Sequence, residues 1–363
     1  MLCLGIETSC DETALGLLQE GRLLAQSLAS QEDMHALFGG VVPEMASREH
    51  LRVLPLLLEQ VQEQAGVDLQ ELDLVAVARG PGLLGSILVG LGLAKGLALS
   101  QGCRLIGVDH LLAHLLAPGL EQNIQYPVLG LLVSGGHTQI YSLYSPFEYQ
   151  VLGRTLDDAA GEAFDKTARL LNLPYPGGRH VDALGSLGRP RQDLFPAPYL
   201  DNNNLDFSFS GLKTAVANFL QQHPELRQDS LQMHPEPEAM ARQNPELADV
   251  CASFNQCVAR ALQVKVQRAL KNRPEIRGLV VAGGVAANSW IRQAMQELAR
   301  EYGLSLYLPG LELCTDNAAM IAYTGWLYAE QGLEHGLELE AVPRGRQIPW
   351  DYACPRMKQY HNP

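Results

Sequence analysis

Two histidines, His110 and His114, stand four residues apart in the segment Asp109-His-Leu-Leu-Ala-His114. Positions i and i+4 of a helix lie on one face, where two imidazoles can bind one metal ion. The helical zinc-protease motif also requires a glutamate directly after the first histidine as general base, and this chain has Leu111 there. The pattern therefore argues against a metal-dependent protease. It leaves two readings open, a metal-binding pair or two histidines that only pack in a helix.

A candidate third ligand follows much later in the chain. Asp316 lies between Thr315 and Asn317, directly before the apolar run 318–322. This is the pattern of a helix start, for which Thr315 is the expected N-cap. Asp316 is alternatively the carboxylate that completes a metal site with the two histidines. Two imidazoles and one carboxylate leave coordination positions open, as a catalytic Fe(II) or Zn(II) site requires.

Three glycine-rich turns, at 134–136, 176–178 and 282–288, are candidate ligand contacts. Glycine lets the backbone come close to a ligand, and amides at a helix N-terminus favour phosphate, although a plain tight turn gives the same pattern. None of the three fits the phosphate-loop lysine motif or the dinucleotide fingerprint. In the segment 157–166, Asp158, Glu162 and Asp165 fall near one helix face, where they are either solvated acids or acceptors for ribose hydroxyls.

Composition limits the class of protein. The chain has 363 residues, 47% hydrophobic and 18% charged, which predicts two globular domains. Its net charge of −13 argues against a broad nucleic-acid-binding face. The seven cysteines are scattered, which predicts reduced thiols in the cytoplasm. No basic leader opens the sequence, and the apolar stretch 83–99 contains four glycines and Lys95, so we expect a buried helix and no membrane span.

The elements that must position these residues form a repeated pattern. Residues 2–28 suggest an apolar strand, a small polar turn and two further strands, and the same pattern begins again at Val128. Helices alternate with the later strands, so we expect an α/β protein with two related lobes facing a cleft. The expected divisions are an N-terminal lobe, 1–125 with a return of 326–345, and a C-terminal lobe, 126–325 with a polar insertion at 223–244. A basic tail, 346–363, follows.

Eight motifs in order give the chain a family resemblance. They are Gly5-Ile-Glu-Thr-Ser-Cys-Asp-Glu-Thr13, Gly39-Gly-Val-Val-Pro-Glu44, His110-x-x-x-His114, Leu132-Val-Ser-Gly-Gly-His-Thr138, Asp157-Asp-Ala-Ala-Gly-Glu-Ala-Phe-Asp-Lys166, Phe207-Ser-Phe-Ser-Gly-Leu-Lys213, Ala282-Gly-Gly-Val-Ala-Ala-Asn288 and Cys314-Thr-Asp-Asn317. Together they resemble the universal tRNA N6-adenosine threonylcarbamoyltransferases, the bacterial TsaD type. The resemblance spans roughly residues 1 to 330. It departs at Asp109, where many members have another histidine and where an acid is expected to orient an imidazole.

The resemblance implies a fold and a reaction. The fold is the actin-like/Hsp70-like ATPase (ASKHA) fold, with two ribonuclease-H-like lobes around a nucleotide cleft. The reaction transfers the threonylcarbamoyl group of threonylcarbamoyl-adenylate to N6 of the adenosine 3′ of the anticodon, in tRNAs that read codons starting with A, and releases AMP. The alternatives are a sugar-kinase-like or chaperone-like ATPase, which predicts rapid ATP turnover, a metal-dependent protease, and an interaction protein.

The resemblance also implies roles for single residues. One divalent metal, Fe(2+) in the family and replaceable by Zn or Mg in crystals, is expected on His110, His114 and Asp316. Substrate contacts are expected from Leu132, Val133, Ser134, Gly135 and Gly136 on the phosphate side, from Asp165, Gly178 and Asp182 at the sugar, and from Asn288 at the adenine. Asp11 and Glu12 are the expected catalytic carboxyls, with capping of a tight turn as the alternative. The implied partners are tRNA, the TsaB and TsaE proteins, and a dimer contact through the N-terminal lobe.

Overall fold

The computed structural model describes residues 1–192, 194–196, 198–228, 236–346 and 348. The chain forms two compact units. Unit 1 comprises Met1–Ile124, Pro146–Glu148 and Pro309–Pro363, and unit 2 comprises Gln125–Ser145 and Tyr149–Leu308. Most of the expected basic tail, 346–363, lies outside the described residues.

Unit 1 contains a five-stranded mixed sheet of order β3-β2-β1-β4-β5. The first three strands form an antiparallel meander, and β4 and β5 continue parallel to β1. The central strands are buried throughout because helices cover both faces, which is why they read as continuous apolar runs. The strands are β1 (Leu2–Glu7), β2 (Glu12–Gln19), β3 (Arg22–Ser30), β4 (Leu74–Gly80) and β5 (Arg104–Asp109).

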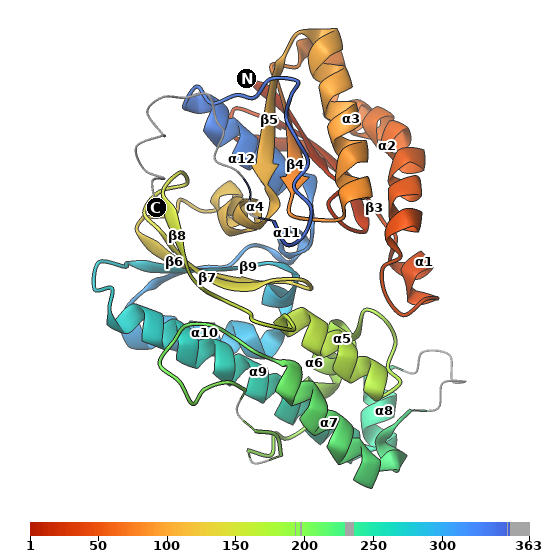
Figure 1. Ribbon diagram of the computed structural model, residues 1–363, viewed down its shortest axis with the longest axis vertical. Helices are drawn as coiled ribbons and strands as arrows, with labels where there is room; N and C mark the ends of the chain where they lie inside the picture. Colours follow the sequence, from red (N-terminus) through yellow and green to blue (C-terminus); the bar gives the residue numbers. More distant parts are fainter. Residues whose placement is uncertain (193, 197, 229–235, 347, 349–363) are drawn as a thin grey trace. The chain divides into compact units, whose positions relative to one another are not determined.

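Helices cover both faces of this sheet (Figure 1). Alternate residues of β1 distinguish the two faces. Leu2, Leu4 and Ile6 join the core formed with α2 and α3, whereas the Cys3 thiol lies 3.5 Å from the Ala322 carbonyl of α12. The helical elements of unit 1 are α1 (Glu32–Ala36), α2 (Pro43–Ala65), η1 (Leu69–Glu71), α3 (Leu84–Gln101), α4 (His110–Leu116), η2 (Ala117–Leu120), α11 (Leu311–Cys314) and α12 (Ala318–Glu330).

The chain returns to unit 1 at Pro309, earlier than the expected residue 326. The reason is the packing of α12, whose small residues fit against glycines of the sheet. A Cβ on Gly5 would collide with the Ala318 carbonyl and would lie 2.6 Å from the Ala322 amide. Segment 309–325 therefore belongs with the first sheet, and so does Asp316.

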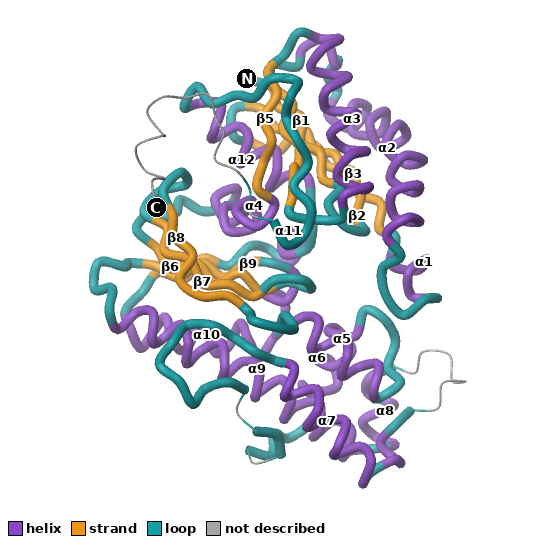
Figure 2. Tube along the Cα trace, viewed as in Figure 1, coloured by secondary structure: helices purple, strands orange, loops and turns teal. Residues whose placement is uncertain are grey.

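Unit 2 repeats the topology of unit 1 with a sheet of order β10-β9-β6-β7-β8. Again three antiparallel strands are followed by two strands parallel to the first. This confirms the duplicated strand pattern. Figure 2 shows the two sheets, one in each unit. The strands are β6 (Val128–Val133), β7 (Thr138–Leu143), β8 (Tyr149–Arg154), β9 (Gly278–Ala282) and β10 (Ser305–Tyr307).

The core of unit 2 lies between its sheet and its helices, with Phe164, Phe207, Phe209 and Phe254 fully buried. The helical elements are α5 (Ala160–Leu170), α6 (Gly177–Leu187), α7 (Ser210–Gln222), η3 (Pro224–Leu226), α8 (Pro237–Gln243), α9 (Pro245–Lys271), η4 (Gly284–Ala287) and α10 (Ser289–Tyr302).

The expected polar insertion at 223–244 is not a solvated loop over its described part. It contains η3 and α8, and Leu226 and Met240 are buried in the unit 2 core. These two apolar side chains pack this polar segment against the core. Residues 229–235 lie outside the described residues.

Helix α3 is long and apolar enough to cross a membrane by length and composition. One side of it packs on β4 and α2, with Ile87, Leu91 and Ala94 buried, while Leu88 and Leu99 are exposed. Only 39% of this helix is buried, so it packs on the sheet with one side, whereas the sequence predicted a buried helix.

Candidate metal centre and nucleotide-binding residues

Helix α4 begins at the end of β5 and places His110 and His114 on one face. Asp109 is its N-cap, and its side-chain oxygen accepts hydrogen bonds from the amides of Leu111 at 2.9 Å and Leu112 at 3.3 Å. Asp109 therefore caps the start of α4. The expectation that its carboxylate would orient an imidazole was wrong. The two rings meet edge to face, with centroids 4.7 Å apart, and the His114 side chain is fully buried.

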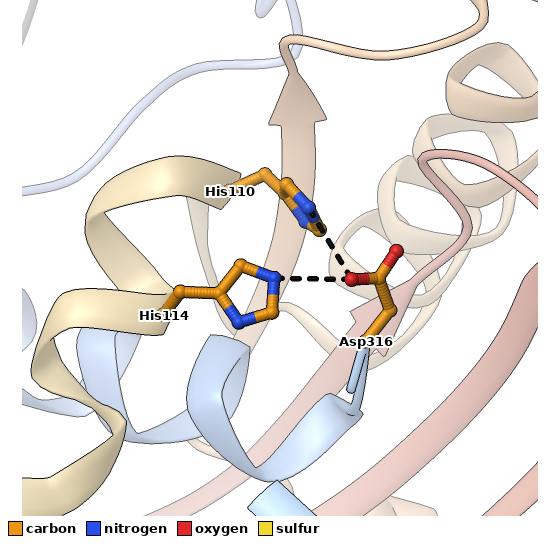
Figure 3. A group of neighbouring side chains, drawn as sticks. All are labelled: His110, His114 and Asp316. Atoms are coloured by element: carbon orange, nitrogen blue, oxygen red, sulfur yellow. Dashed lines mark hydrogen bonds and ion pairs between the residues drawn. The ribbon is translucent and has the colours of Figure 1, made fainter. Parts of the chain in front are cut away.

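Asp316 reaches the two histidines from the turn between α11 and α12. Its Oδ1 lies 3.0 Å from His114 Nε2 and 3.6 Å from His110 Nε2 (Figure 3). Asn317, and not the expected Thr315, caps α12 by accepting a hydrogen bond from the Met320 amide at 2.9 Å. Asp316 is therefore not the N-cap of α12, and its carboxylate faces the two histidines.

Two residues at the end of β1 support His110, a role that was not predicted for either of them from the sequence. Glu7 is fully buried, and its Oε2 lies 2.9 Å from His110 Nδ1. The Ser9 hydroxyl lies 3.2 Å from the same nitrogen, and the Ser9 amide donates to Glu7 Oε1 at 2.5 Å. A carboxylate on Nδ1 turns Nε2 toward a metal, as in most metal-binding histidines. A charged residue ending an otherwise apolar strand was the signal available in the sequence.

The donor set fits a divalent cation. One ligand atom from each of His110, His114 and Asp316 falls within 4.8 Å of the others. Burial alone would lower the pKa of His110, but the negative charges of Glu7 and Asp316 raise it to about 9. The same negative charges attract a divalent cation, which has to displace this proton in order to bind His110. Two nitrogens and one carboxylate oxygen suit Fe(II) or Zn(II), and three protein ligands leave positions for substrate.

The candidate catalytic carboxyls lie beside this group. Asp11 is in the turn after β1, and Glu12 begins β2. Burial, with the charges of Asp11 and Asp316, raises the pKa of Glu12 well above its usual value. The same two aspartates contribute to the raised pKa of Cys10. Acids from the β1–β2 turn and from the α11–α12 turn therefore share one electrostatic environment.

The expected phosphate-side residues of unit 2 follow the end of β6. Leu132 and Val133 are buried in the strand, and Ser134-Gly-Gly136 form the turn. The Gly161 amide at the start of α5 donates to the Ser134 carbonyl at 3.3 Å, and a Cβ on Gly161 would lie 2.7 Å from the Gly135 Cα. A Cβ on Gly135 itself would meet open space. The turn is thus tightly packed on one side and open where a ligand can approach.

Two of the other expected nucleotide contacts, Asp165 in α5 and Asp182 in α6, accept hydrogen bonds from the start of another helix. Asp165 Oδ1 accepts from the Gly177 amide at 2.8 Å, next to Gly178. Asp182 accepts from the Ser289 amide at 3.0 Å and from the Ser289 hydroxyl at 2.7 Å.

Asn288 has structural roles of its own in this region. It caps α10 through the Ile291 amide at 3.1 Å, and its side-chain NH₂ donates to Asn255 at 2.7 Å. These two hydrogen bonds occupy one acceptor position and one N–H of the Asn288 side-chain amide. A contact with adenine would have to use the remaining donor or acceptor of the same amide.

Comparison with known proteins identifies relatives of the chain. The model of the TsaD family, tRNA N6-adenosine threonylcarbamoyltransferase, matches residues 22–323. A protein of that name from Maridesulfovibrio salexigens is 58% identical over 354 residues, 98% of this chain and 99% of its own length. Another from Desulfovibrio desulfuricans is 56% identical over 352 residues, 97% of this chain and 96% of its own.

Among solved structures, HypF from T. kodakarensis matches with a TM-score of 0.54 and 16% identity, over 91% of this chain and 48% of that protein. This likeness concerns the fold alone. With the duplicated 3-2-1-4-5 sheet topology and the family match, it confirms the actin-like ATPase fold that the motifs implied.

Proposed function

Because the chain belongs to the tRNA N6-adenosine threonylcarbamoyltransferase family, we propose that it modifies tRNA. It transfers the threonylcarbamoyl group of threonylcarbamoyl-adenylate to N6 of the adenosine 3′ of the anticodon, in tRNAs reading codons that start with A. The observation that carries this proposal is the convergence of His110, His114 and Asp316 next to two further carboxyls. A protease is disfavoured, since Leu111 is a buried apolar residue where the general base would stand.

His110, His114 and Asp316 would hold one divalent cation, most simply Fe(2+), with Zn(2+) as the substitute. When bound, the cation supplies Lewis acidity that polarises the carbamoyl carbonyl. Glu7 and Ser9 hold the His110 ring in place through Nδ1. Because these partners are buried, the ligand geometry is set before substrate arrives.

Asp11 and Glu12 act on the attacking amine. The N6 nitrogen forms a bond to the carbamoyl carbon, the bond from that carbon to the adenylate phosphate oxygen breaks, and AMP leaves with the electron pair. The amine must lose one proton, and a carboxylate of this turn accepts it. AMP is a good leaving group, so positioning of the two substrates carries much of the barrier reduction.

The adenylate half of the substrate is assigned to unit 2. The turn 132–136 would face its phosphate, Asp165, Gly178 and Asp182 its ribose, and Asn288 its adenine. The open side of Gly135 supports this assignment, as do the hydrogen bonds from Asp165 and Asp182 to the starts of α6 and α10, beside Gly178 and Asn288.

We also propose that the chain works in the cytoplasm with TsaB and TsaE proteins. A protein contact through unit 1, with a second copy or with TsaB, is supported by exposed leucines on the adjacent helices α2 and α3. These are Leu51, Leu56, Leu84 and Leu88. A net charge of −13 agrees with help from partners in holding tRNA.

Mass spectrometry of tRNA nucleosides tests the function. The chain, reconstituted with iron, both partners, tRNA and the adenylate, is expected to yield threonylcarbamoyladenosine and AMP in equal amounts. Omitting tRNA or using a tRNA whose anticodon is followed by guanosine should abolish the product. Absence of product with every component present would refute the proposed function, and rapid ATP turnover by the isolated chain would favour the ATPase alternative.

A further inference from the structure

The last described segment of unit 1 forms a C-terminal strap, residues 335–346, that lies along β5 and β4 (Figure 1, blue). The His335 amide donates to the Leu105 carbonyl at 2.8 Å, and the Val342 amide donates to the Arg79 carbonyl at 2.7 Å. The Arg79 side chain is buried and donates through Nε to the Glu340 carbonyl at 3.3 Å. The strap is thus attached to the sheet along its length.

The strap ends at the loop that supports the metal centre. The Arg344 amide donates to the Gly82 carbonyl at 2.9 Å, and Pro343 pairs with Gly82. A Cβ on Gly82 would collide with the Ser9 carbonyl, and that carbonyl accepts from the Leu83 amide at 2.8 Å. Ser9 in turn contacts His110. Main-chain contacts through Gly82 and Ser9 therefore link Arg344 to His110, a candidate metal ligand.

The turn at the end of the strap presents two arginines. The Arg346 amide donates to the Pro343 carbonyl at 3.2 Å, and Gly345 has a φ of 86°, which closes the turn. Arg344 and Arg346 are both exposed. Among the described residues, neither guanidinium is paired with a carboxylate, whereas Arg48 and Arg52 of α2 pair with Glu44 and Glu49.

Acidic side chains surround the metal centre. Glu7, Asp11, Glu12, Asp109 and Asp316 all lie in or beside it. An RNA substrate must bring its phosphates near these acids when its adenosine enters. Exposed guanidinium groups near the metal centre can offset this repulsion, because they are suited to phosphate.

We propose that Arg344 and Arg346 bind backbone phosphates of the RNA substrate next to the adenosine that is modified. The inference rests on the proposed function and adds the residues that hold the substrate at this site. The backbone hydrogen bonds of the strap fix the turn, so the two guanidinium groups extend from a positioned platform.

The test compares tRNA binding and turnover in the reconstituted complex for Arg344→Ala, Arg346→Ala and the double variant. Each alanine should raise the KM and Kd for tRNA roughly two- to fivefold at low salt and leave kcat nearly unchanged. Each should also reduce the slope of log Kd against log salt by about 0.7 to 1, the contribution of one phosphate contact. The strap should stay folded, because its bonds to Gly82 and Arg79 use the backbone.

Two controls make the test specific. The pair Arg344→Lys and Arg346→Lys keeps the charge and should retain most of the binding and the salt slope. Arg22→Ala removes an exposed arginine of β3 at the opposite end of the same sheet and should change nothing.

The outcomes separate this inference from the proposed function. An active wild type with unchanged KM and salt slope in the double variant would overturn the inference alone. Equal losses in Arg22→Ala, or a full loss in the lysine variants, would also overturn it. An inactive wild type refutes the proposed function instead.

Discussion

His114 Nε2 lies 3.0 Å from Asp316 Oδ1, although 202 residues separate the two in the sequence. Two local structures produce this proximity. Asp109 starts the helix that carries the histidine, and Asn317 starts the helix that follows the aspartate. The pair lies wholly within unit 1, so the metal ligands are assembled by one sheet and its helices.

Removing the buried carboxylate behind His110 should weaken metal binding without removing a ligand. In Glu7→Gln the side chain keeps its size but loses the charge that orients the imidazole, so we expect metal affinity to fall about 10- to 100-fold. Competition with a chromogenic chelator measures this. Glu20→Gln, at the opposite end of the sheet, is the control. Equal affinity in Glu7→Gln and wild type would contradict the role given to Glu7.

The contact between β1 and α12 should be intolerant of added volume. Gly5→Ala places a methyl group where the Ala318 carbonyl stands, and overpacking of this kind costs about 1–3 kcal/mol or more. Gly96→Ala in α3 is the matched control. Its Cβ meets open space inside a helix, and it should stabilise by about 0.5–1 kcal/mol. Thermal unfolding that ranks the two variants in the other order would refute this packing.

Asp157 should make the stability of unit 2 depend on acid pH. Its burial would raise the pKa, but hydrogen bonds from the Ser208 and Ser210 hydroxyls outweigh this and lower the pKa below its usual 3.8. The stabilisation from a lowered pKa is present above about pH 4 and disappears as the pH falls through the folded value.

The variant Asp157→Asn is therefore expected to unfold at a lower temperature than wild type at pH 7. The difference should shrink as the pH falls below about 4 and through the folded pKa of Asp157. Calorimetric scans between pH 2.5 and pH 7 measure it, with Asp201→Asn as a surface control. A difference that does not change with pH would show that charge is not the cause.

Much of the fold was predictable because its signals are local. The strand–turn–strand pattern of residues 2–28, which begins again at Val128, revealed the duplication. The i, i+4 spacing placed the two histidines on one helix face. The start of the last helix drew attention to Asp316, although Thr315 was the wrong cap.

The remaining features depend on contacts that the sequence does not encode locally. Helix α12 is apolar on all sides, so its pattern cannot tell which sheet it covers, and the return to unit 1 was expected too late. Glu7 ends a buried strand, and only the position of His110 103 residues later gives it a role. Leu226 and Met240 hold a polar segment on the core that composition alone describes as solvated.

Metal analysis combined with product analysis tests the central claim most directly. Wild type reconstituted with iron should contain one iron per chain and form threonylcarbamoyladenosine in tRNA, whereas His114→Ala and Asp316→Asn should lose both together. Asp73→Asn, a surface change in the same unit, should keep both. Full iron content and full product in His114→Ala or Asp316→Asn would contradict the claim that these residues form the metal centre of the enzyme.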